Sequence, residues 1–532
     1  MQTQHNTQGN TAELPNIESE LARFEEEERR RLGLDAVEEK KQWTDTINRD
    51  FFADQREHTT ILVSGLTMAH DNFVQAGLAG LGYKIKALDC PDNEALQFGK
   101  EYGNRGQCNP TYFTVGNLVK YLCKLRDEQG LSTQEIIDNH VFLTAGACGP
   151  CRFGMYVTEY RKALSDAGFE GFRVMLFDAN GGMSQATGRE VGLKMDRAFF
   201  ITLAKAILGG DALNAIMYRI RPYEVVPGST NEAITKCRDE IMSALKEKKS
   251  IYRALYRCRK ILQKVEVDRT LVKPKVSVIG EFWAMTTEGE GNYFLQKFLE
   301  QEGAEVDIQL ITGWIMYNIW QARIDTKQRM RLRDIDGEAR KGLKTTQTAK
   351  KFLTLKIAEW ALKGTFYSFG KVLGLKNYHL PNMEENAELA SEHYNNELRG
   401  GEGHMEVGKL IQTVIHNKAH MVISVKPFGC MPSSGVSDGV QSIITEKYPE
   451  AIFLPIETSG DGAVNVYSRI QMMLFKAKRA AEKEYQTLLE EKQLSVDQVK
   501  AKIAKSRRLS KSTYYAPHKA AGTAANFLVD AA

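Results

Sequence analysis

The sequence has little of what marks membrane, secreted and nucleic-acid-binding proteins. It contains no run of about 18 apolar residues, so we expect no transmembrane helix and no membrane partner. The opening residues carry neither a basic segment nor an apolar core, so we expect no secretory signal and a cytoplasmic location. Lys and Arg number 71 and Asp and Glu 67, and the resulting net charge of +4 argues against nucleic acid as a partner.

Several catalytic motifs are also missing. The chain has no G-x-x-x-x-G-K-S/T loop for P-loop ATP hydrolysis, no G-x-S-x-G nucleophile turn and no H-E-x-x-H zinc motif. The segment GEGNYF at 289–294 lacks the full G-x-G-x-x-G spacing of a dinucleotide site. His416 and His420 lie four residues apart, and we interpret them as surface or capping residues.

What is present is a repeated alternation of β-rich and helical segments. The 532 residues suffice for two to four domains at roughly 100–200 residues each. Strand, helix and strand follow one another at βαβ spacing, which predicts an α/β fold with open, mostly parallel sheets. We expect strands at 59–65, 83–89, 140–146 and 172–178 in a first unit, and at 275–282, 304–311, 420–429 and 451–457 in a second.

The expected organisation follows from these two units and the charged segments around them. We predict a charged helical N-terminal extension, a first α/β lobe, a helical segment, a second α/β lobe with a basic helical insertion near 321–400, and a basic helical C-terminal extension. We expect the last stretch, from 511 onward, to be a loose tail. The boundaries are 1–57, 58–205, 206–271, 272–475 and 476–532.

The placement of the eight cysteines is more informative than their number. Three expected strands, in two units far apart in the sequence, are each followed by cysteine. Because ligands bind beyond the carboxyl ends of strands in open parallel sheets, these cysteines can converge on one site between two lobes. Glycine and proline surround them and leave room for an inorganic group. The candidate metal ligands are Cys108, Cys148, Cys151 and Cys430, with Cys90 as a fifth.

Other readings of the cysteines remain open. Strand, CGPC and helix is also the thioredoxin arrangement, but a dithiol reductase leaves Cys108 and Cys430 unexplained. A structural zinc site usually draws on two CxxC-like pairs, and only one is present. Cys123, Cys237 and Cys258 lie in apolar or helical stretches, where we expect buried core thiols.

Three cysteine motifs carry a resemblance to a known family. GACGPCRFGMYVTEYRKAL, QCNPTYFTVGNLV and VKPFGCMPSSGVSDGV resemble the iron–sulfur proteins related to 2-hydroxyacyl-CoA dehydratase and benzoyl-CoA reductase subunits. The sequence looks closest to double-cubane cluster proteins and to the cluster-bearing region of the large CoA-substrate-specific activase proteins. The resemblance covers roughly residues 58–475, and IGEFWAMTTEGEGNYFLQKFLEQEGAEV looks like the family's second lobe.

The resemblance implies a fold, a cofactor and partners. It implies two flavodoxin-like α/β lobes with an iron–sulfur cluster, either 4Fe–4S or an 8Fe–9S double cubane, in the crevice between them. A double cubane of the family takes six cysteines, and the sixth would have to be Cys123, Cys237 or Cys258, or else come from elsewhere. Low-potential electrons would come from a separate ATP-dependent iron–sulfur activase of actin/Hsp70-like fold, and the family leans to homodimers.

These implications lead to three hypotheses for function. The leading one is an iron–sulfur oxidoreductase that reduces a small molecule, in which Arg152 and Lys426, beside the cysteine motifs, offset cluster charge or bind an anionic substrate. The second is a subunit of a 2-hydroxyacyl-CoA dehydratase with a single 4Fe–4S cluster. The third is a non-enzymatic scaffold or activator that carries a structural metal.

Overall fold

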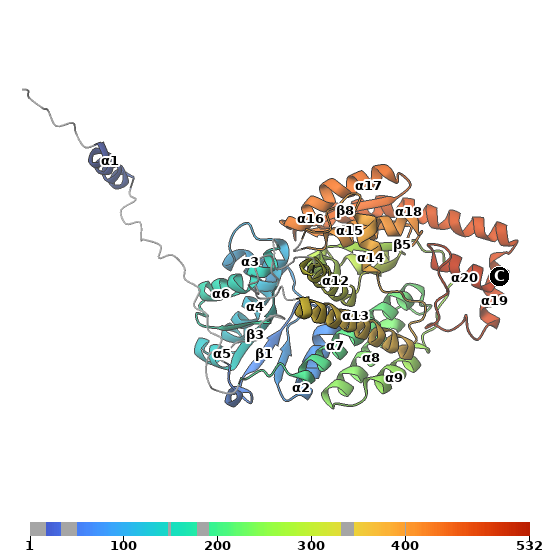
Figure 1. Ribbon diagram of the computed structural model, residues 1–532, viewed down its shortest axis with the longest axis horizontal. Helices are drawn as coiled ribbons and strands as arrows, with labels where there is room; N and C mark the ends of the chain where they lie inside the picture. Colours follow the sequence, from blue (N-terminus) through green and yellow to red (C-terminus); the bar gives the residue numbers. More distant parts are fainter. Residues whose placement is uncertain (1–16, 33–50, 147–150, 178–190, 331–344, 399–400) are drawn as a thin grey trace, which may run out of the picture. The chain divides into compact units, whose positions relative to one another are not determined.

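The computed structural model describes residues 17–32, 51–146, 151–177, 191–330, 345–398 and 401–532. The chain divides into two units, Met1–Asp45 and Thr46–Ala532. The first unit contains α1 (Ile17–Arg31), a charged helix with i,i+4 pairs such as Arg29 with Glu25. The second unit contains every other element and is described below (Figure 1).

The second unit is built around two four-stranded parallel sheets. Their strand orders are β2-β1-β3-β4 and β6-β5-β7-β8, so each sheet has the order of the first four strands of a flavodoxin-like fold. The predicted α/β fold with two flavodoxin-like lobes is therefore confirmed. All eight expected strands are present: β1 (Thr60–Val63), β2 (Lys84–Ala87), β3 (His140–Ala145), β4 (Arg173–Phe177), β5 (Lys275–Gly280), β6 (Glu305–Ile308), β7 (Met421–Pro427) and β8 (Ile452–Thr458).

Lobe 1 covers its sheet with helices on both faces. Because both faces are covered, the inner strands are continuous apolar runs rather than alternating ones, as in HVFL of β3. Local capping sets several helix starts: Asp92 accepts from the Ala95 N–H, and Ser132 and Glu135 form a capping box. The helices are α2 (Met68–Gly80), α3 (Asn93–Tyr102), α4 (Asn109–Asp127), α5 (Thr133–Asn139) and α6 (Tyr156–Asp166).

Lobe 2 repeats this arrangement with longer connections. All seven residues of its inner strand β7 are buried. A single turn of π-helix, Val436–Val440, interrupts the helical run after β7. Its helices are α10 (Phe282–Thr286), α11 (Leu295–Gln301), α12 (Ile311–Arg329), α13 (Thr345–Leu373), α14 (Met383–Ala390), α15 (Gly403–Ile415), α16 (Met431–Gly435), α17 (Gln441–Lys447) and α18 (Ala463–Lys492).

A helical segment joins the lobes. It consists of α7 (Arg197–Ile220), α8 (Ser229–Lys246) and α9 (Ile251–Leu262), which share one apolar core with lobe 1 and with α13. Within the described residues, Arg197–Tyr223 is the one stretch long and apolar enough to cross a membrane by length and composition, and 61% of its apolar window is buried inside the protein. Burial of this kind is typical of a core helix, so the stretch is weak evidence for a membrane span.

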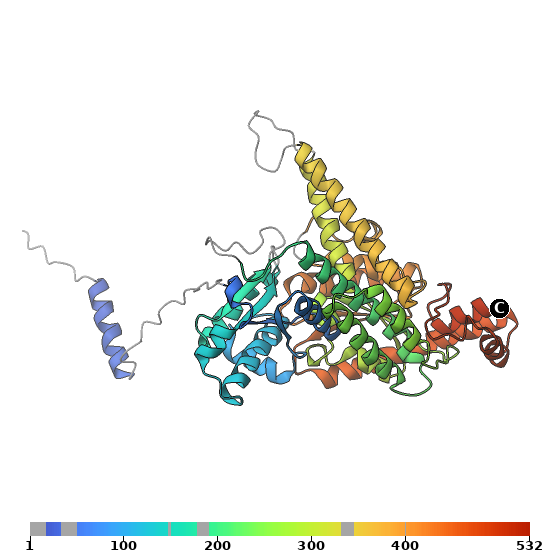
Figure 2. The same cartoon turned by 90° about the horizontal axis from the view of Figure 1, so that it is seen from below.

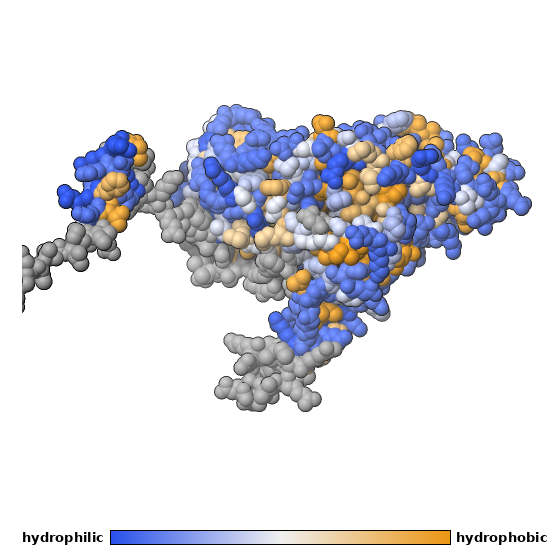
Figure 3. All heavy atoms as spheres, turned by 90° about the horizontal axis from the view of Figure 1, so that it is seen from above, coloured by the Kyte–Doolittle hydropathy of each residue, from blue (hydrophilic) through white to orange (hydrophobic). Residues whose placement is uncertain are grey.

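The expected basic insertion contains two long helices. Figure 2 shows α12 and α13, in yellow, projecting together away from the sheets. Leu353, Ile357 and Trp360 are exposed on α13, and hydrophobic side chains interrupt the polar surface of this projection in Figure 3.

The expectation of a loose C-terminal tail is wrong. After α19 (Val496–Lys505), the chain packs back and ends in α20 (Thr523–Ala531), whose Phe527 and Leu528 are fully buried. Thr523 and Tyr515 both donate hydrogen bonds to the buried carboxylate of Glu305 at the start of β6. These contacts with residues far away in the sequence hold the C-terminal segment in place. The composition of the segment alone does not indicate that it docks in this way.

Candidate functional site

The two lobes bring equivalent edges of their sheets to one junction. In each sheet the strand order reverses between the first and third strands, and such switch points are where ligands bind in open α/β sheets. Cys151 follows β3, the third strand of lobe 1, and Cys430 follows β7, the third strand of lobe 2. The two predicted motifs therefore occupy corresponding positions in the two lobes.

Cysteine starts a helical segment at three places of this junction. Cys108 is the N-cap residue of α4, Cys430 is that of α16, and Cys151 precedes the short 3-10 helix Arg152–Met155. Pro110 and Pro432 lie in the first turns of α4 and α16, where proline fits because its missing N–H has no helical partner. The field of a helix N-terminus favours thiolate and anionic groups, which suits a cysteine-bound cluster.

Direct contacts join Cys108 of lobe 1 to the Cys430 loop of lobe 2. The N–H of Asn109 donates to the Phe428 carbonyl over 3.0 Å. Gly429 has a φ of +77°, and a Cβ there would lie 3.2 Å from the Cys108 Cα. A larger residue at 429 would strain the backbone and separate the two cysteine loops.

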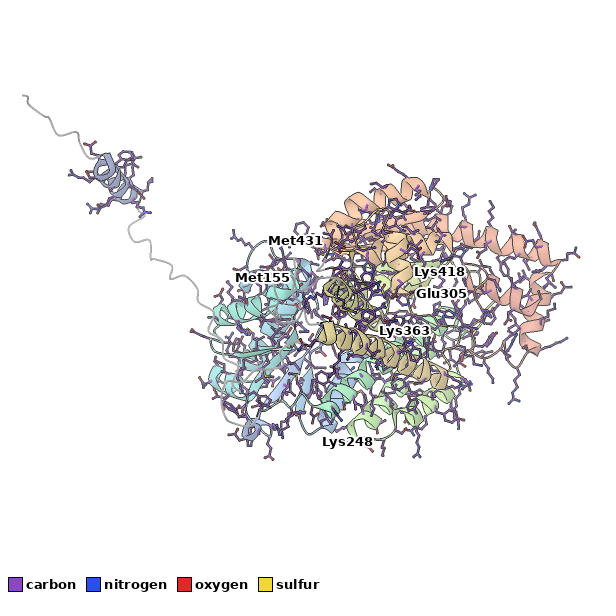
Figure 4. All side chains as sticks on the ribbon, in the orientation of Figure 1. Met155, Lys248, Glu305, Lys363, Lys418 and Met431 are labelled. Atoms are coloured by element: carbon purple, nitrogen blue, oxygen red, sulfur yellow. The ribbon has the colours of Figure 1, made fainter. Side chains whose placement is uncertain are left out.

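The Cys108 thiol is buried and polar-lined. Its Sγ lies 3.0 Å from the Thr111 hydroxyl and 3.1 Å from the Tyr156 hydroxyl. Cys151 interacts electrostatically with Cys108. Figure 4 labels Met155 and Met431, which follow Cys151 and Cys430 and mark the two sides of the junction. The predicted ligand Cys148 lies outside the described residues.

Three carboxyl groups beside these thiols were not predicted from the sequence. Burial raises the pKa of Glu281, which caps α10 by accepting from the Trp283 and Ala284 N–H groups. Burial, together with the charges of Glu281 and Glu406, raises the pKa of Glu402 to about 8. Burial also raises the pKa of Glu406 to about 7, although Ser433 donates a hydrogen bond to it.

The sequence marks these three glutamates only weakly as candidates for a functional site. Glu281 directly follows β5, as the cysteines follow their strands, and Glu406 lies in the first turn of the largely buried helix α15. Either pattern is common on a capped or solvated helix. Only the packing of α10, α15 and the Cys430 loop brings the three together.

The electrostatics disfavour free thiolates at this junction. Burial raises the pKa of Cys151 to about 12, and the charges of Glu281 and Glu402 add to the shift. Burial and the charge of Glu281 also raise the pKa of Cys430. Cysteine ligands must lose their protons to bind a metal, so these thiols need a strongly positive group beside them.

Cys90 lies at the lobe junction, against the segment of lobe 2 that contains Thr287 and Gly289. Its Sγ is 3.9 Å from the Thr287 hydroxyl of lobe 2, and burial raises the pKa of its thiol. The neighbouring charged groups are Glu288 and the buried Asp71. Glu288 also accepts a hydrogen bond from the Met68 N–H over 2.9 Å, which ties this part of lobe 2 to α2.

The two predicted cations have different surroundings. Arg152 donates to the Gly106 carbonyl and so links the CGPC segment to the loop before Cys108. Lys426 is only 6% exposed and interacts with Glu406. Both residues therefore lie close to the cysteine loops, and each is engaged with the protein itself.

The remaining cysteines lie in helical cores. Cys123 is about 22 Å along α4 from Cys108, at 1.5 Å per residue. Cys237 and Cys258 are fully buried, and each thiol donates to the other's backbone carbonyl across α8 and α9. The sixth ligand of a double cubane was expected among these three residues, and their described contacts place none of them with Cys108, Cys151 or Cys430.

The described donor residues do not form a compact site for a single metal ion. Among the described residues, no three His, Cys, Asp or Glu side chains are grouped closely enough to hold a single ion. A cubane keeps its thiolates further apart than one ion does, because iron and sulfide atoms lie between them. Cys108 and Cys151 belong to lobe 1 and Cys430 to lobe 2, so a cluster held by these thiols together with Cys148 would bridge the two lobes.

Comparisons with known proteins add no assignment. No protein-family model matches the chain, and no curated protein matches it.

Proposed function

We propose that this chain is an iron–sulfur electron-transfer reductase that takes low-potential electrons from a separate ATP-dependent partner. The observation that carries the proposal is the meeting of the Cys108 and Cys430 loops of opposite lobes, with Cys151 beside them, at the switch points of both sheets. Cys108, Cys148, Cys151 and Cys430 would hold the cluster, which when bound supplies one-electron storage at a potential set by burial and hydrogen bonds.

The cysteine count favours one cubane over two. A double cubane of the resembling family takes six cysteines, and at most five of the eight in this chain remain available. Cys237 and Cys258 are enclosed in the core between α8 and α9, and Cys123 lies about 22 Å along α4 from Cys108. Cys90, the fifth, contacts Thr287 rather than another cysteine.

The buried carboxyl groups give the site a source of protons. With a pKa of about 8, Glu402 keeps its proton at neutral pH, and it accepts the indole N–H of Trp314 over 2.9 Å. Reduction of a small molecule generally needs protons as well as electrons. In this proposal Glu402 holds the proton at its carboxyl oxygen and delivers it to substrate at the lobe junction.

The test is the iron and acid-labile sulfide content of anaerobically purified protein, with spectra before and after reduction. We expect about four irons per chain and a broad absorption near 400 nm that bleaches on reduction. About eight irons would instead support the double cubane. Zinc, or no metal at all, would overturn the proposal and favour a structural metal or the dithiol reading of CGPC.

Substitution of single cysteines checks the ligand assignment. Cys108→Ser and Cys430→Ser should each remove most of the iron, because each removes one thiolate from the junction. Cys258→Ser is the matched control and should retain it, since Cys258 lies in the α8–α9 core. Equal iron retention in all three variants would contradict the assignment.

A dehydratase subunit is the second candidate, and the same cysteine count favours it. A single cubane is what that family uses to make a ketyl radical from an acyl-CoA. The discriminating measurement incubates the reduced protein with a 2-hydroxyacyl-CoA and follows loss of water from the thioester. Turnover would establish the dehydratase, whereas reduction of small molecules without thioester turnover would support the reductase.

A further inference from the structure

A basic cavity lies far in sequence from the cysteine motifs. It has a volume of about 370 Å³ and forms where α9, the end of α13 and the segment after α19 meet. Five of its lining residues are basic, and none of the others is acidic. The basic residues are Arg259, Lys376, Arg507, Arg508 and Lys511.

Buried contacts fix the wall of this cavity. Ser512 is 2% exposed, donates to the Leu262 carbonyl over 2.7 Å and accepts from the Arg269 guanidinium over 2.7 Å. Thr513, also buried, accepts from the Gln263 amide over 3.3 Å. The segment that carries Arg507 and Lys511 is therefore anchored to the end of α9.

The cavity charge is largely uncompensated. Of the five cations, Arg508 pairs with Asp530 over 3.1 Å. Within the described part of the chain, Arg259, Lys376, Arg507 and Lys511 make no ion pair with an acidic side chain. Like charges that converge on a recess raise its potential and attract anions from solution.

Helix ends explain only part of this charge. Arg259 lies in the last turn of α9, and Lys376 follows the end of α13, where a cation interacts favourably with the helix dipole. Arg507 and Lys511 lie beyond the end of α19 and have no such role. The helix dipole therefore does not explain why Arg507 and Lys511 line this cavity.

We propose that this cavity binds a compact polyphosphate, such as the phosphate chain of a nucleoside di- or triphosphate. Guanidinium groups match phosphate oxygens in a fork geometry, and lysines add point charges around them. The volume lies at the lower end of small-ligand pockets, which suits several linked phosphates. The proposal concerns binding alone and does not depend on the cysteine site.

The test measures binding to the full-length protein by calorimetry and by thermal stability at low ionic strength. Inorganic tripolyphosphate, inorganic diphosphate and ADP are the three probes. We expect tripolyphosphate to raise the melting temperature, and added salt to weaken its binding. If ADP binds at least tenfold more tightly than inorganic diphosphate, the natural ligand is a nucleotide; if the two bind equally, it is recognised by its phosphates.

Two double variants separate a built site from general charge. Arg507→Ala with Lys511→Ala should weaken tripolyphosphate binding at least tenfold. Lys492→Ala with Lys500→Ala removes two exposed cations from the same region outside the cavity and should change it less than twofold. Lys376→Ala changes a cation on a different segment of the cavity and should also weaken tripolyphosphate binding. It tests the proposal independently if the first double variant does not fold.

Two results would overturn the proposal. One is that none of the three probes produces binding heat or raises the melting temperature of the wild-type protein. The other is an equal loss of binding in the two double variants, since that would reflect net charge rather than this cavity.

Discussion

At the scale of single residues, Glu484 helps to dock the C-terminal segment. Its carboxylate accepts from the Ala521 and Gly522 N–H groups, each over 2.9 Å, and lies 3.1 Å from the His420 ring nitrogen. Burial by itself would raise the pKa of Glu484, but these hydrogen bonds and the charge of His420 outweigh it. The pKa falls to about 2.

The lowered pKa makes docking of this segment sensitive to acid. Because the folded pKa lies below the unfolded value, Glu484 stabilises the fold above about pH 4.5, and that contribution disappears as pH falls toward 2. We expect Glu484→Gln to cost about 2–3 kcal/mol at pH 7 and progressively less below pH 4.5. Thermal unfolding of both proteins between pH 3 and 7 measures this. A constant difference across that range would contradict the assignment.

Candidate site residues could be predicted from the sequence only where their local context was distinctive. Cys108, Cys151 and Cys430 could be singled out because glycine and proline surround them and expected strands or helices adjoin them. Glu281, Glu402 and Glu406 could not, because their shared burial depends on how three distant segments pack.

At the scale of elements, the close crossing of α3 and α4 positions the helix that begins at Cys108. Gly99 and Gly116 lie at the crossing, and a Cβ on Gly116 would come within 1.8 Å of the Ala95 carbonyl oxygen. The backbones can approach this closely only because no side chain intervenes.

Gly116→Ala should therefore separate the two helices. We expect it to lower the free energy of unfolding by about 1–3 kcal/mol, the usual cost of overpacking a core. Gly364→Ala is the matched control, because a Cβ there meets nothing within 4 Å on the exposed face of α13. That control should stabilise by about 0.5–1 kcal/mol through helix propensity. Urea unfolding followed by circular dichroism compares them, and similar effects of the two would contradict the close-crossing account.

Helices and strands could be predicted where the hydrophobic pattern of their own residues indicates them. The inner strands could be predicted because each is largely an apolar run, as burial on both faces requires, whereas the edge strand β2, KIKA, was indicated by its βαβ spacing. The docked tail could not be, because α20 is held by Glu305 and Glu484, more than 200 and 30 residues away in the sequence.

At the scale of the second unit, buried polar contacts couple the lobes. Asp211 of α7 accepts from the Ile311 and Thr312 N–H groups at the start of α12, over 3.1 and 2.6 Å. The same carboxylate lies 3.1 Å from the His70 ring nitrogen of α2. Phe113 of α4 and Trp283 of α10 add a ring contact across the junction, with centroids 5.5 Å apart. These contacts predict that the two lobes unfold together.

The distribution of tryptophan allows a direct test of this coupling. No tryptophan lies between residues 44 and 282, so four of the five indoles, Trp283, Trp314, Trp320 and Trp360, belong to the helices of lobe 2 and report on it. Phe142→Ala empties a buried position in β3 of lobe 1 and should cost about 3–5 kcal/mol. If the lobes form one cooperative unit, the fluorescence midpoint in urea should shift as far as the circular dichroism midpoint.

Phe200→Ala is the control, because it makes the same chemical change at a half-exposed site on α7. It should change the free energy of unfolding measured by either probe by less than about 1 kcal/mol. An unmoved fluorescence midpoint in Phe142→Ala would mean that lobe 2 folds independently, and the buried Asp211 contacts would then not couple the two lobes.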